Sequence, residues 1–365
     1  MTGIPAAVIF AGGLGSRLAP YTDDLPKPLV IAANRVAISY TMQLLAQHLI
    51  EDVAVIYRDP RIRLVLERLW GDRFRFVWLA ERNRVGTGGA LRSVPHEFRE
   101  RDLVLLTADM VNTVDLTAAL SSHRGSNAHV SIATASAPAD LWEGDVLTTD
   151  SQSRVNSYGP PHKFGLAGET VQGSTGIQIV SPGPFWNLIP LDGFVHLSQD
   201  LLPAAIASKL DVFAFAAEHF PWDFGYPEEI LAGMRRLLQG DFAPLFSFGD
   251  ATTVRIAATA NVHESVFLSG PLVVGAGAVI ERGCRIHGPS SIGQGSHLGQ
   301  DVHIDCSVVM AGSIVPAGTS LVSGILGQPS KQWAIIDEIS RGHPEDLMNW
   351  PEGKALPASD SGGSH

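Results

Sequence analysis

A six-residue repeat near the C-terminus constrains the fold of this chain more than any other feature. Eleven of twelve residues taken at every sixth position are aliphatic or Met. Small residues often follow them, as in Val274-Gly275-Ala276-Gly277. This pattern predicts short flat faces, each with one apolar side chain turned inward, and tight corners of small residues between them. The positions are Ile256, Val262, Leu268, Val274, Ile280, Ile286, Ile292, Leu298, Ile304, Met310, Pro316 and Val322.

Three such hexads close one triangular coil, so twelve would make about four coils. The pattern resembles the left-handed parallel β-helix of hexapeptide-repeat proteins, and we place this β-helix at 254–326. A linker is expected at 241–253, before the repeat. In the segment 327–350, Trp333, Ile336 and Ile339 predict one short helix that could cap the open end of the solenoid. The composition of 351–365 predicts a disordered tail.

Residues 1–240 follow a different pattern, in which short apolar runs alternate with helical periodicity. This alternation predicts an α/β catalytic domain that is Rossmann-like, with a mostly parallel sheet covered by helices on both faces. Ligands then bind outside the carboxyl ends of the strands, which directs attention to the loops after Ala11, Glu81 and Asp109. The expected strands are Ala6 to Ala11, Asp52 to Arg58, Phe74 to Glu81, Leu103 to Asp109 and His129 to Ala135. The expected helices are Leu116 to His123, Pro227 to Gln239, and one bearing the stripe Ile38, Met42, Leu45 and Leu49.

Composition excludes several classes of protein. A net charge of −11 argues against a nucleic-acid partner, since binding one requires clustered Lys and Arg. No apolar run approaches the roughly 20 residues that span a bilayer, and the N-terminus lacks a signal-peptide pattern. We therefore expect a cytoplasmic protein with no membrane partner. Cys284 and Cys306 are too few for a disulfide framework or a zinc site.

A glycine-rich segment directly after the first strand carries the most chemical information. Its glycines allow backbone N–H groups to turn toward a phosphate chain at close range. Arg17 and Lys27 supply the positive charge that a nucleoside triphosphate requires. The segment is neither a Walker A loop nor a dinucleotide-binding motif, because the residues that those motifs need are missing. Its expected phosphate-contacting residues are Ala11, Gly12, Gly13, Gly15 and Ser16.

Extended through Pro26-Lys27-Pro28, this segment resembles the signature of the sugar-1-phosphate nucleotidyltransferases, some of which also carry a C-terminal left-handed β-helix. Four later segments resemble that family in the same order. They are the base-recognition loop Gly86-Thr87-Gly88-Gly89-Ala90-Leu91, the strand end Leu106-Thr107-Ala108-Asp109, Ser198 to Pro203, and Trp222-Asp223-Phe224-Gly225-Tyr226-Pro227-Glu228.

The resemblance implies roles for individual residues. Asp109 and Asp223 would hold a catalytic Mg²⁺, which suits a hard cation whose remaining ligands are phosphate oxygens. Thr87, Gly88 and Gly89 would contact the nucleobase. The variant of this loop looks most like that of the heptose-phosphate guanylyltransferases, so GTP is favoured, while ATP, UTP and dTTP remain open.

The acceptor half of the site departs from the family. Where a Glu-Lys-Pro segment is usual, this chain has Tyr158-Gly159-Pro160-Pro161-His162-Lys163, so the glutamate that would bind a sugar hydroxyl is missing. Lys163 is a displaced candidate for the acceptor phosphate, and Tyr226 replaces a usual Thr. Ser174, Thr175 and Gly176 stand where Asn-x-Gly is usual. We infer an unusual acceptor: a heptose phosphate, a modified hexose phosphate, or a cyclitol phosphate of the kind used in aminocyclitol biosynthesis.

The expected reaction is in-line attack of an acceptor phosphate oxygen on the α-phosphorus, with release of pyrophosphate. Its nucleophile is already anionic, so catalysis requires positioning and charge stabilisation rather than a general base. Arg17 and Lys27 are the expected catalytic cations. The β-helix is expected to serve as an oligomerisation or packing module, so a homo-oligomer is predicted.

Two alternatives stay open at this stage. An additional acyltransferase activity is suggested by the resemblance of Gly327-Gln328-Pro329-Ser330-Lys331 to a segment of β-helical acyltransferases. The candidate histidines for such an activity are His263, His287, His297 and His303. The second alternative is a non-catalytic regulatory subunit, which would be expected to have lost the phosphate and metal ligands that this chain retains.

Overall fold

The computed structural model describes residues 4–138, 142, 144–164, 170–217, 221–243 and 245–351. The chain forms two compact units, which we call the sheet unit and the solenoid unit. The sheet unit comprises Met1–Gly13 and Tyr40–Asp223, and the solenoid unit comprises Leu14–Ser39 and Phe224–His365. The division between these units falls after Asp223, and the segment Leu14–Ser39 belongs to the same unit as the C-terminal residues. The predicted domain boundary at residue 240 stays a prediction. The tail 352–365, for which disorder was predicted, lies outside the described residues.

The sheet unit is built on a nine-stranded mixed sheet whose main path runs β10-β9-β11-β6-β1-β4-β5. Strands β6, β1, β4 and β5 are parallel, and β11 runs antiparallel to β6, β8 and β9. The strands are β1 (Ala6–Ala11), β4 (Asp52–Tyr57), β5 (Arg75–Ala80), β6 (Leu103–Thr107), β8 (Val130–Pro138), β9 (Val146–Thr149), β10 (Val155–Gly159), β11 (Thr170–Val180) and β12 (Val212–Ala216). The predicted Rossmann-like sheet is thus confirmed.

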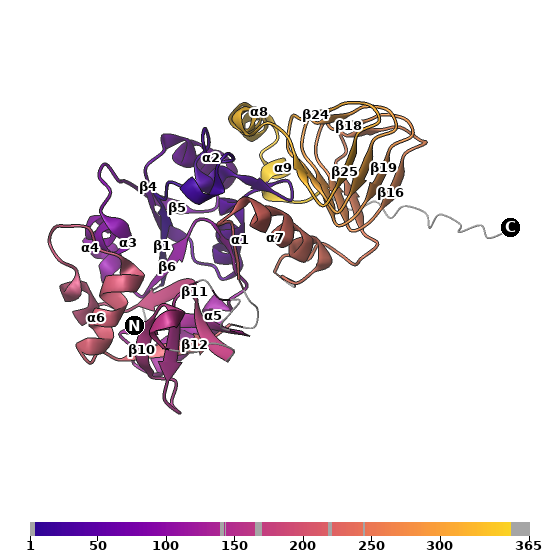
Figure 1. Ribbon diagram of the computed structural model, residues 1–365. Coiled ribbons are helices and arrows are strands. Elements are labelled where there is room, and N and C mark those ends of the chain that lie inside the picture. Colours follow the sequence, from indigo (N-terminus) through magenta and orange to yellow (C-terminus); the bar gives the residue numbers. More distant parts are fainter. Residues whose placement is uncertain are drawn as a thin grey trace. The chain divides into compact units, whose positions relative to one another are not determined.

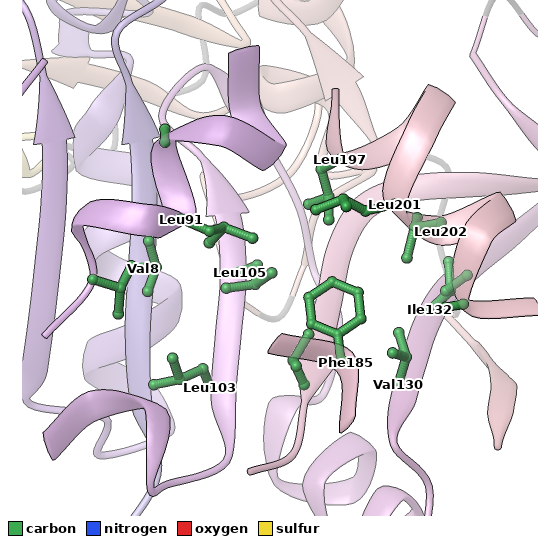
Figure 2. Packing of buried hydrophobic residues seen from close by; sticks show 14 of the residues in the cluster. Val8, Leu91, Leu103, Leu105, Val130, Ile132, Phe185, Leu197, Leu201 and Leu202 are labelled. Carbon is green, nitrogen blue, oxygen red and sulfur yellow. The ribbon is translucent and has the colours of Figure 1, made fainter. Parts of the chain in front are cut away.

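Helices cover this sheet, and the residues on β1 are buried on both of its faces. Figure 2 shows one layer of the core, in which Val8 of β1, Leu105 of β6 and Ile132 of β8 face helical segments that carry Leu91, Phe185 and Leu201. The helical segments are α1 (Ile38–Gln47), α2 (Pro60–Trp70), α3 (Gly86–Ala90), η3 (Leu91–Ser93), α4 (His96–Arg99), α5 (Leu116–Gly125), η6 (Pro184–Leu188), η7 (Leu197–Leu201) and α6 (Leu202–Ala207).

One residue of the predicted helical stripe is misplaced. Leu49 lies beyond the end of α1, has a φ of 55°, and is 73% exposed. The chain turns after Gln47 toward β4, so Leu49 belongs to the turn and not to the buried face. Ile38, Met42 and Leu45 are fully buried, as predicted.

The solenoid unit contains three parallel sheets, as expected for a left-handed β-helix of about four coils. Figure 1 shows the coils stacked in one body, with α8 (Gln332–Gly342) and α9 (Glu345–Met348) along its flank. The strands are β14 (Val254–Ile256), β15 (Asn261–Val262), β16 (Phe267–Ser269), β17 (Leu272–Val274), β18 (Val279–Ile280), β19 (Arg285–His287), β20 (Ser290–Ile292), β21 (His297–Leu298), β22 (His303–Asp305), β23 (Val308–Val309), β24 (Ile314–Val315), β25 (Ser320–Val322) and β26 (Ile325–Leu326).

The predicted register of the repeat fails in the last coil. Val274 pairs with Ile292, but Ile292 pairs with Val309, Leu298 with Val315 and Ile304 with Leu321. The corner between Ile304 and Val309 is one residue shorter than the six-residue step assumes, and Cys306 turns there with a φ of 47°. The inward row therefore continues through Val309, Val315 and Leu321. Accordingly, the predicted row members Met310, Pro316 and Val322 are one position out, and Val322 is 59% exposed.

Two helices follow the coils where one was predicted. The Gln332 amide of α8 donates to the Ala311 carbonyl at 2.9 Å, and the side chain of Ile335 lies against Gly312. These contacts are with the corner after β23. Helix α7 (Pro227–Gln239) also belongs to this unit, and Arg235 donates to the Cys306 carbonyl at 3.1 Å.

Candidate functional site

The carboxyl end of β1 is the natural ligand position of the sheet unit. β1 lies between β4 and β6, with Ala11 opposite Tyr57 and Phe10 opposite Thr107. After β1 the next strands of the sheet, β4 and β5, lie on one side of β1, and β6 then lies on its other side. A parallel sheet opens a crevice where the strand order reverses in this way. Gly12 and Gly13 follow at this edge.

Gly12 lies in close contact with two charged side chains. A Cβ on Gly12 would lie 2.5 Å from Glu81 Oε2 and 3.3 Å from Arg58 Cγ, whereas a Cβ on Gly13 would meet nothing within 4 Å. The structure therefore places a carboxylate and a guanidinium-bearing side chain beside the glycine-rich turn. Sequence reasoning missed both residues as site residues, although each follows a strand whose end it had located.

A short ribbon brings the two aspartates predicted to bind metal together. β7 (Met110–Val111) pairs antiparallel with β13 (Trp222–Asp223), and Asp223 stands opposite Met110, the neighbour of Asp109. Both carboxylates are partly exposed. Two buried oxygens nearby in the chain, Thr107 Oγ1 and Asn112 Oδ1, have no hydrogen-bond partner among the described residues. These hard oxygen donors fit a divalent cation such as Mg²⁺.

The predicted acceptor residues of β11 lie against the same ribbon. Gly176 has a φ of +79°, and a Cβ there would come 2.7 Å from Met110 Sδ, so only glycine fits. Thr175 is fully buried, and its hydroxyl donates to the Ala133 carbonyl at 3.1 Å. The Thr175 side chain is therefore unavailable to an acceptor. Ser174 remains partly exposed.

Lys163 is exposed at the end of the short helix η5 (Pro161–Lys163) and lies beside Gly159 of β10, where a Cβ would be 3.5 Å from Lys163 Cδ. Burial, and then the negative charge of Asp145, raises the pKa of the neighbouring Tyr158 hydroxyl. Tyr158 therefore stays protonated at neutral pH. Asp145 was not among the predicted site residues, and its backbone carbonyl accepts from the Ser174 N–H at 2.9 Å.

In the predicted base-recognition loop, the glycines have a packing role. A Cβ on Gly88 would meet Leu201 Cδ1 at 2.9 Å, and one on Gly89 would meet Val85 Cβ at 3.1 Å. Thr87 Oγ1 accepts from the Leu197 N–H at 3.0 Å, which fixes α3 to the start of η7. The contact of this loop with a nucleobase stays a prediction.

The solenoid unit holds Gly15, Ser16, Arg17 and Lys27. Gly15 has a φ of +66°, and a Cβ there would lie 2.9 Å from Lys27 Cβ. Thr22 Oγ1 donates to the Gly15 carbonyl at 2.7 Å, which closes the loop. The structure thus packs Gly15 directly against Lys27, whose side chain is 7% exposed.

Arg17 lies on an aromatic side chain. It occupies η1 (Ser16–Leu18), and its guanidinium donates to the Tyr226 hydroxyl at 3.1 Å and stands 4.7 Å from the centre of that ring. Tyr226 is itself fixed at the start of α7, where its N–H donates to Glu229 Oε2 at 2.8 Å. Tyrosine, in place of the usual Thr, therefore gives Arg17 both a hydrogen bond and a cation–π contact.

The predicted residues are thus divided between the units. The sheet unit carries Ala11, Gly12, Gly13, Thr87, Gly88, Gly89, Asp109, Lys163, Ser174, Thr175, Gly176 and Asp223, and the solenoid unit carries Gly15, Ser16, Arg17 and Lys27. The solenoid histidines make contacts with other solenoid residues. His297 bonds Glu281 at 2.8 Å and His287 bonds Ser269 at 2.9 Å, in each case across adjacent coils.

Comparison with known proteins finds a family that matches the N-terminal part of the chain. The nucleotidyl transferase family matches residues 6–155, which contain the glycine-rich turn, the base-recognition segment and Asp109. The chain carries a nucleotidyl transferase domain. No helix within the described ranges has the length and apolar character that a membrane span needs.

Relatives extend the similarity beyond the nucleotidyl transferase domain. The chain is 26% identical over 309 residues to a UTP–glucose-1-phosphate uridylyltransferase of Synechocystis sp., covering 79% of this chain and 78% of the relative. It is 25% identical over 292 residues to a mannose-1-phosphate guanylyltransferase of Mycobacterium tuberculosis, covering 77% and 78%. A D-glycero-alpha-D-manno-heptose 1-phosphate guanylyltransferase of Aneurinibacillus thermoaerophilus is 24% identical over 234 residues, covering 63% and 97%.

Proposed function

We propose that this protein is a magnesium-dependent nucleotidyltransferase that transfers a nucleoside monophosphate from a triphosphate, GTP by preference, to a sugar-1-phosphate or cyclitol phosphate, releasing pyrophosphate. The observation that carries the proposal is the pairing of Asp223 opposite Met110, beside Asp109, by a ribbon within a nucleotidyl transferase family fold. Two carboxylates brought together in this way suit a divalent cation whose remaining ligands are phosphate oxygens.

The cations and the glycine-rich segment act on the phosphates. Backbone N–H groups from Ala11 to Ser16 bind the triphosphate, and Lys27, held against Gly15, provides a fixed ammonium beside this loop. Arg17 stabilises the negative charge that develops on the departing pyrophosphate. Because the acceptor phosphate is already ionised, no side chain has to remove a proton from it.

Asp109 and Asp223 would hold the Mg²⁺ through their carboxylates. When bound, the ion supplies charge neutralisation and orientation for phosphate oxygens. The partly exposed positions of the two carboxylates leave room for phosphate oxygens as further ligands. The buried Thr107 and Asn112 oxygens can orient waters or ligands around the pair.

Glu81 supports the preference for guanine. Its carboxylate lies against Gly12 at the start of the turn, and Glu81 Oε1 also accepts from the Val85 N–H at 3.4 Å, just before the base-recognition loop. Guanine presents adjacent N–H donors on one edge, which a carboxylate accepts together, whereas uracil and thymine present one N–H between two carbonyl oxygens. Two of the relatives described above are also guanylyltransferases.

The acceptor is proposed to be a phosphorylated sugar or cyclitol with an unusual pattern of hydroxyls. Lys163 is exposed and suited to its phosphate. Asp145 is the nearest candidate to replace the missing glutamate, because its backbone bonds that of Ser174 and its charge acts on Tyr158. A carboxylate accepting from two vicinal hydroxyls selects between epimers of such an acceptor.

A screen of pyrophosphate release tests these assignments. Each nucleoside triphosphate is paired with hexose, heptose and cyclitol phosphates, with and without Mg²⁺. Release that needs GTP, an acceptor and Mg²⁺ supports the proposal, and release from no pair, at any Mg²⁺ concentration, refutes it.

The base assignment has its own variant. Glu81→Gln should lower the GTP-over-UTP ratio of kcat/KM about tenfold, the scale of one lost charge-assisted contact. Glu97→Gln, which changes an exposed glutamate of α4, is the matched control. An unchanged ratio in Glu81→Gln would remove Glu81 from base recognition.

A further inference from the structure

The hairpin after Lys27 is buried although its turn is polar. β2 (Ile31–Ala32) and β3 (Arg35–Val36) are joined by Ala33 and Asn34, which have φ values of 48° and 64°. Two-residue turns with positive φ at both positions usually lie at the surface. Here Asn34 is 3% and Arg35 is 2% exposed. Burying such a turn is costly unless its polar groups are bonded.

The third coil of the solenoid supplies those bonds. Asn34 Nδ2 donates to the Ile292 carbonyl at 2.9 Å, and Gln294 Nε2 donates to the Asn34 carbonyl at 2.8 Å. Gln294 is 1% exposed, and it also donates to the Asp346 carbonyl at 3.1 Å. These reciprocal hydrogen bonds between Asn34 and the corner at Ile292–Gln294 fix both the position and the direction of the turn.

The segment after the coils closes over the hairpin. Trp350 Nε1 donates to the Ala33 carbonyl at 2.8 Å. The Arg35 guanidinium stands 5.4 Å from the Trp350 ring centre and 5.6 Å from that of Phe246. Ala33 thus combines an unfavourable φ with a hydrogen bond from the indole to its carbonyl.

The hairpin directly follows the short helix that carries Lys27, one of the two proposed catalytic cations. Val30 follows η2 (Lys27–Leu29), and its carbonyl accepts from the Ala37 N–H at 2.9 Å across the base of the hairpin. Lys27 in turn packs against Gly15, in the glycine-rich segment. An unbroken series of contacts within one unit thus runs from the solenoid corner to the phosphate loop.

We propose that the third coil of the β-helix positions this loop, with Asn34 and Gln294 as positioning residues that act on Lys27 and Gly15 through the hairpin. This inference rests on the proposed function and adds to it a catalytic role for the β-helix, which is otherwise expected only to pack or oligomerise. Neither residue touches substrate. We call the hydrogen bonds of Asn34 with Ile292 and Gln294 the hairpin lock. Loss of the hairpin lock should make the phosphate loop more mobile and lower kcat more than it raises KM, because a misplaced charge weakens transition-state stabilisation most.

The repeat itself offers a matched control. Gln300 occupies the same position one hexad after Gln294, but its side chain accepts from Arg282 Nε at the surface, at 3.1 Å. We would compare Gln294→Leu with Gln300→Leu in the full-length protein, and add Asn34→Gly, which keeps the positive φ and removes the side chain. Gln332→Leu removes a buried hydrogen bond between α8 and the Ala311 carbonyl, which is not part of the hairpin. This variant therefore measures how much activity is lost through a general loss of stability.

Two readouts decide the outcome. Hydrogen exchange of residues 27–37 should rise about tenfold in Gln294→Leu and Asn34→Gly, and kcat should fall about tenfold while KM for the nucleotide stays within about twofold. Gln300→Leu should match wild type in both. The proposal is overturned if exchange in 27–37 is unchanged, or if Gln332→Leu lowers kcat as much as Gln294→Leu does. A wild-type protein without activity would refute the proposed function instead.

Discussion

The two units hold their charged candidate residues by different means. In the sheet unit, a two-stranded backbone ribbon places Asp223 opposite Met110, the neighbour of Asp109. In the solenoid unit, Arg17 and Lys27 lie on the short helices η1 and η2. Contacts of side chains support them: Tyr226 for Arg17, and the hydrogen bonds between Asn34 and the third coil for Lys27. Positions set by backbone pairing tolerate nearby substitutions, whereas positions set by side chains do not.

This contrast has a consequence for how function is lost. Near the aspartates, the largest losses should come from removing a carboxylate or from crowding the ribbon, as a side chain at Gly176 would. By contrast, substitutions of residues that never touch substrate should matter around the cations, because they hold the loop. The predictions below test that asymmetry, beginning with the carboxylates.

Removal of either aspartate should have the largest effect. Asp109→Ala or Asp223→Ala should lower turnover roughly 10³-fold, the equivalent of the several kcal/mol of charge stabilisation that a bound Mg²⁺ provides. Pyrophosphate release at increasing Mg²⁺ measures it, and the melting temperature should not change. Asp72→Ala, at an exposed position of the sheet unit, is the control. Equal Mg²⁺ dependence in variant and wild type would contradict the metal assignment.

Arg17→Ala should follow, with a fall in kcat of roughly 10²-fold, the scale of one lost transition-state charge contact. The side chain is exposed, so stability should be retained. Arg282→Ala, an arginine on the solenoid surface, should leave the rate unchanged. A normal rate in Arg17→Ala would remove this residue from the mechanism.

The same contrast explains what could be read from the sequence. The solenoid was predictable because each inward side chain marks a face, and the prediction failed only where a corner loses one residue, between Ile304 and Val309. Five of the nine sheet strands, β1, β4, β5, β6 and β8, were found from apolar runs, whereas β9 to β12 were not predicted. The ribbon that pairs Asp223 with Met110 was not predicted either, because two-residue strands have no periodicity, and the aspartates were identified only through family resemblance.

Other parts of the candidate site could not be predicted for a related reason. Glu81 and Gln294 look like surface residues in the sequence, and only tertiary packing places one beside Gly12 and the other beneath Asn34. The packing of Gly88 against Leu201 was not predicted either, and the expected contact of Gly88 with a nucleobase stays a prediction. Long-range contacts of this kind leave no local pattern.

A buried histidine should make the sheet unit sensitive to acid. His123 is 1% exposed and bonds the Ser131 and Ser181 hydroxyls at 2.8 and 2.7 Å. Burial lowers its pKa from 6.5 to about 4, against the opposing charge of Asp102 and with minor contributions from Arg124 and His129. The folded state therefore binds a proton less readily than the unfolded state. The contribution of neutral His123 to the free energy of unfolding is fully present above pH 6.5 and is lost as the pH falls toward 4.

The expected loss between pH 8 and pH 5 is about 2 kcal/mol of unfolding free energy. Denaturant unfolding at both pH values measures it. His123→Gln should reduce the difference between the two pH values, whereas a substitution of the exposed His96 should not. A pH dependence identical in wild type and His123→Gln would contradict this explanation.

The smallest effect is expected at Tyr226, where the side-chain support of Arg17 can be removed in two steps. Tyr226→Phe deletes the hydroxyl that accepts from Arg17 but keeps the ring, and Tyr226→Thr removes both contacts. An exposed cation–π pair is worth about 0.5–1 kcal/mol, so kcat should fall about twofold in the first variant and about fivefold in the second. The fold should persist, because the Tyr226 contact that caps α7 comes from its backbone N–H. Glu229→Gln weakens that cap and keeps Tyr226, so it separates loss of the helix start from loss of the Tyr226 side chain. If Tyr226→Thr retained the wild-type kcat and KM, Arg17 would need no side-chain support, and the contrast between the two units would then rest on the hairpin lock alone.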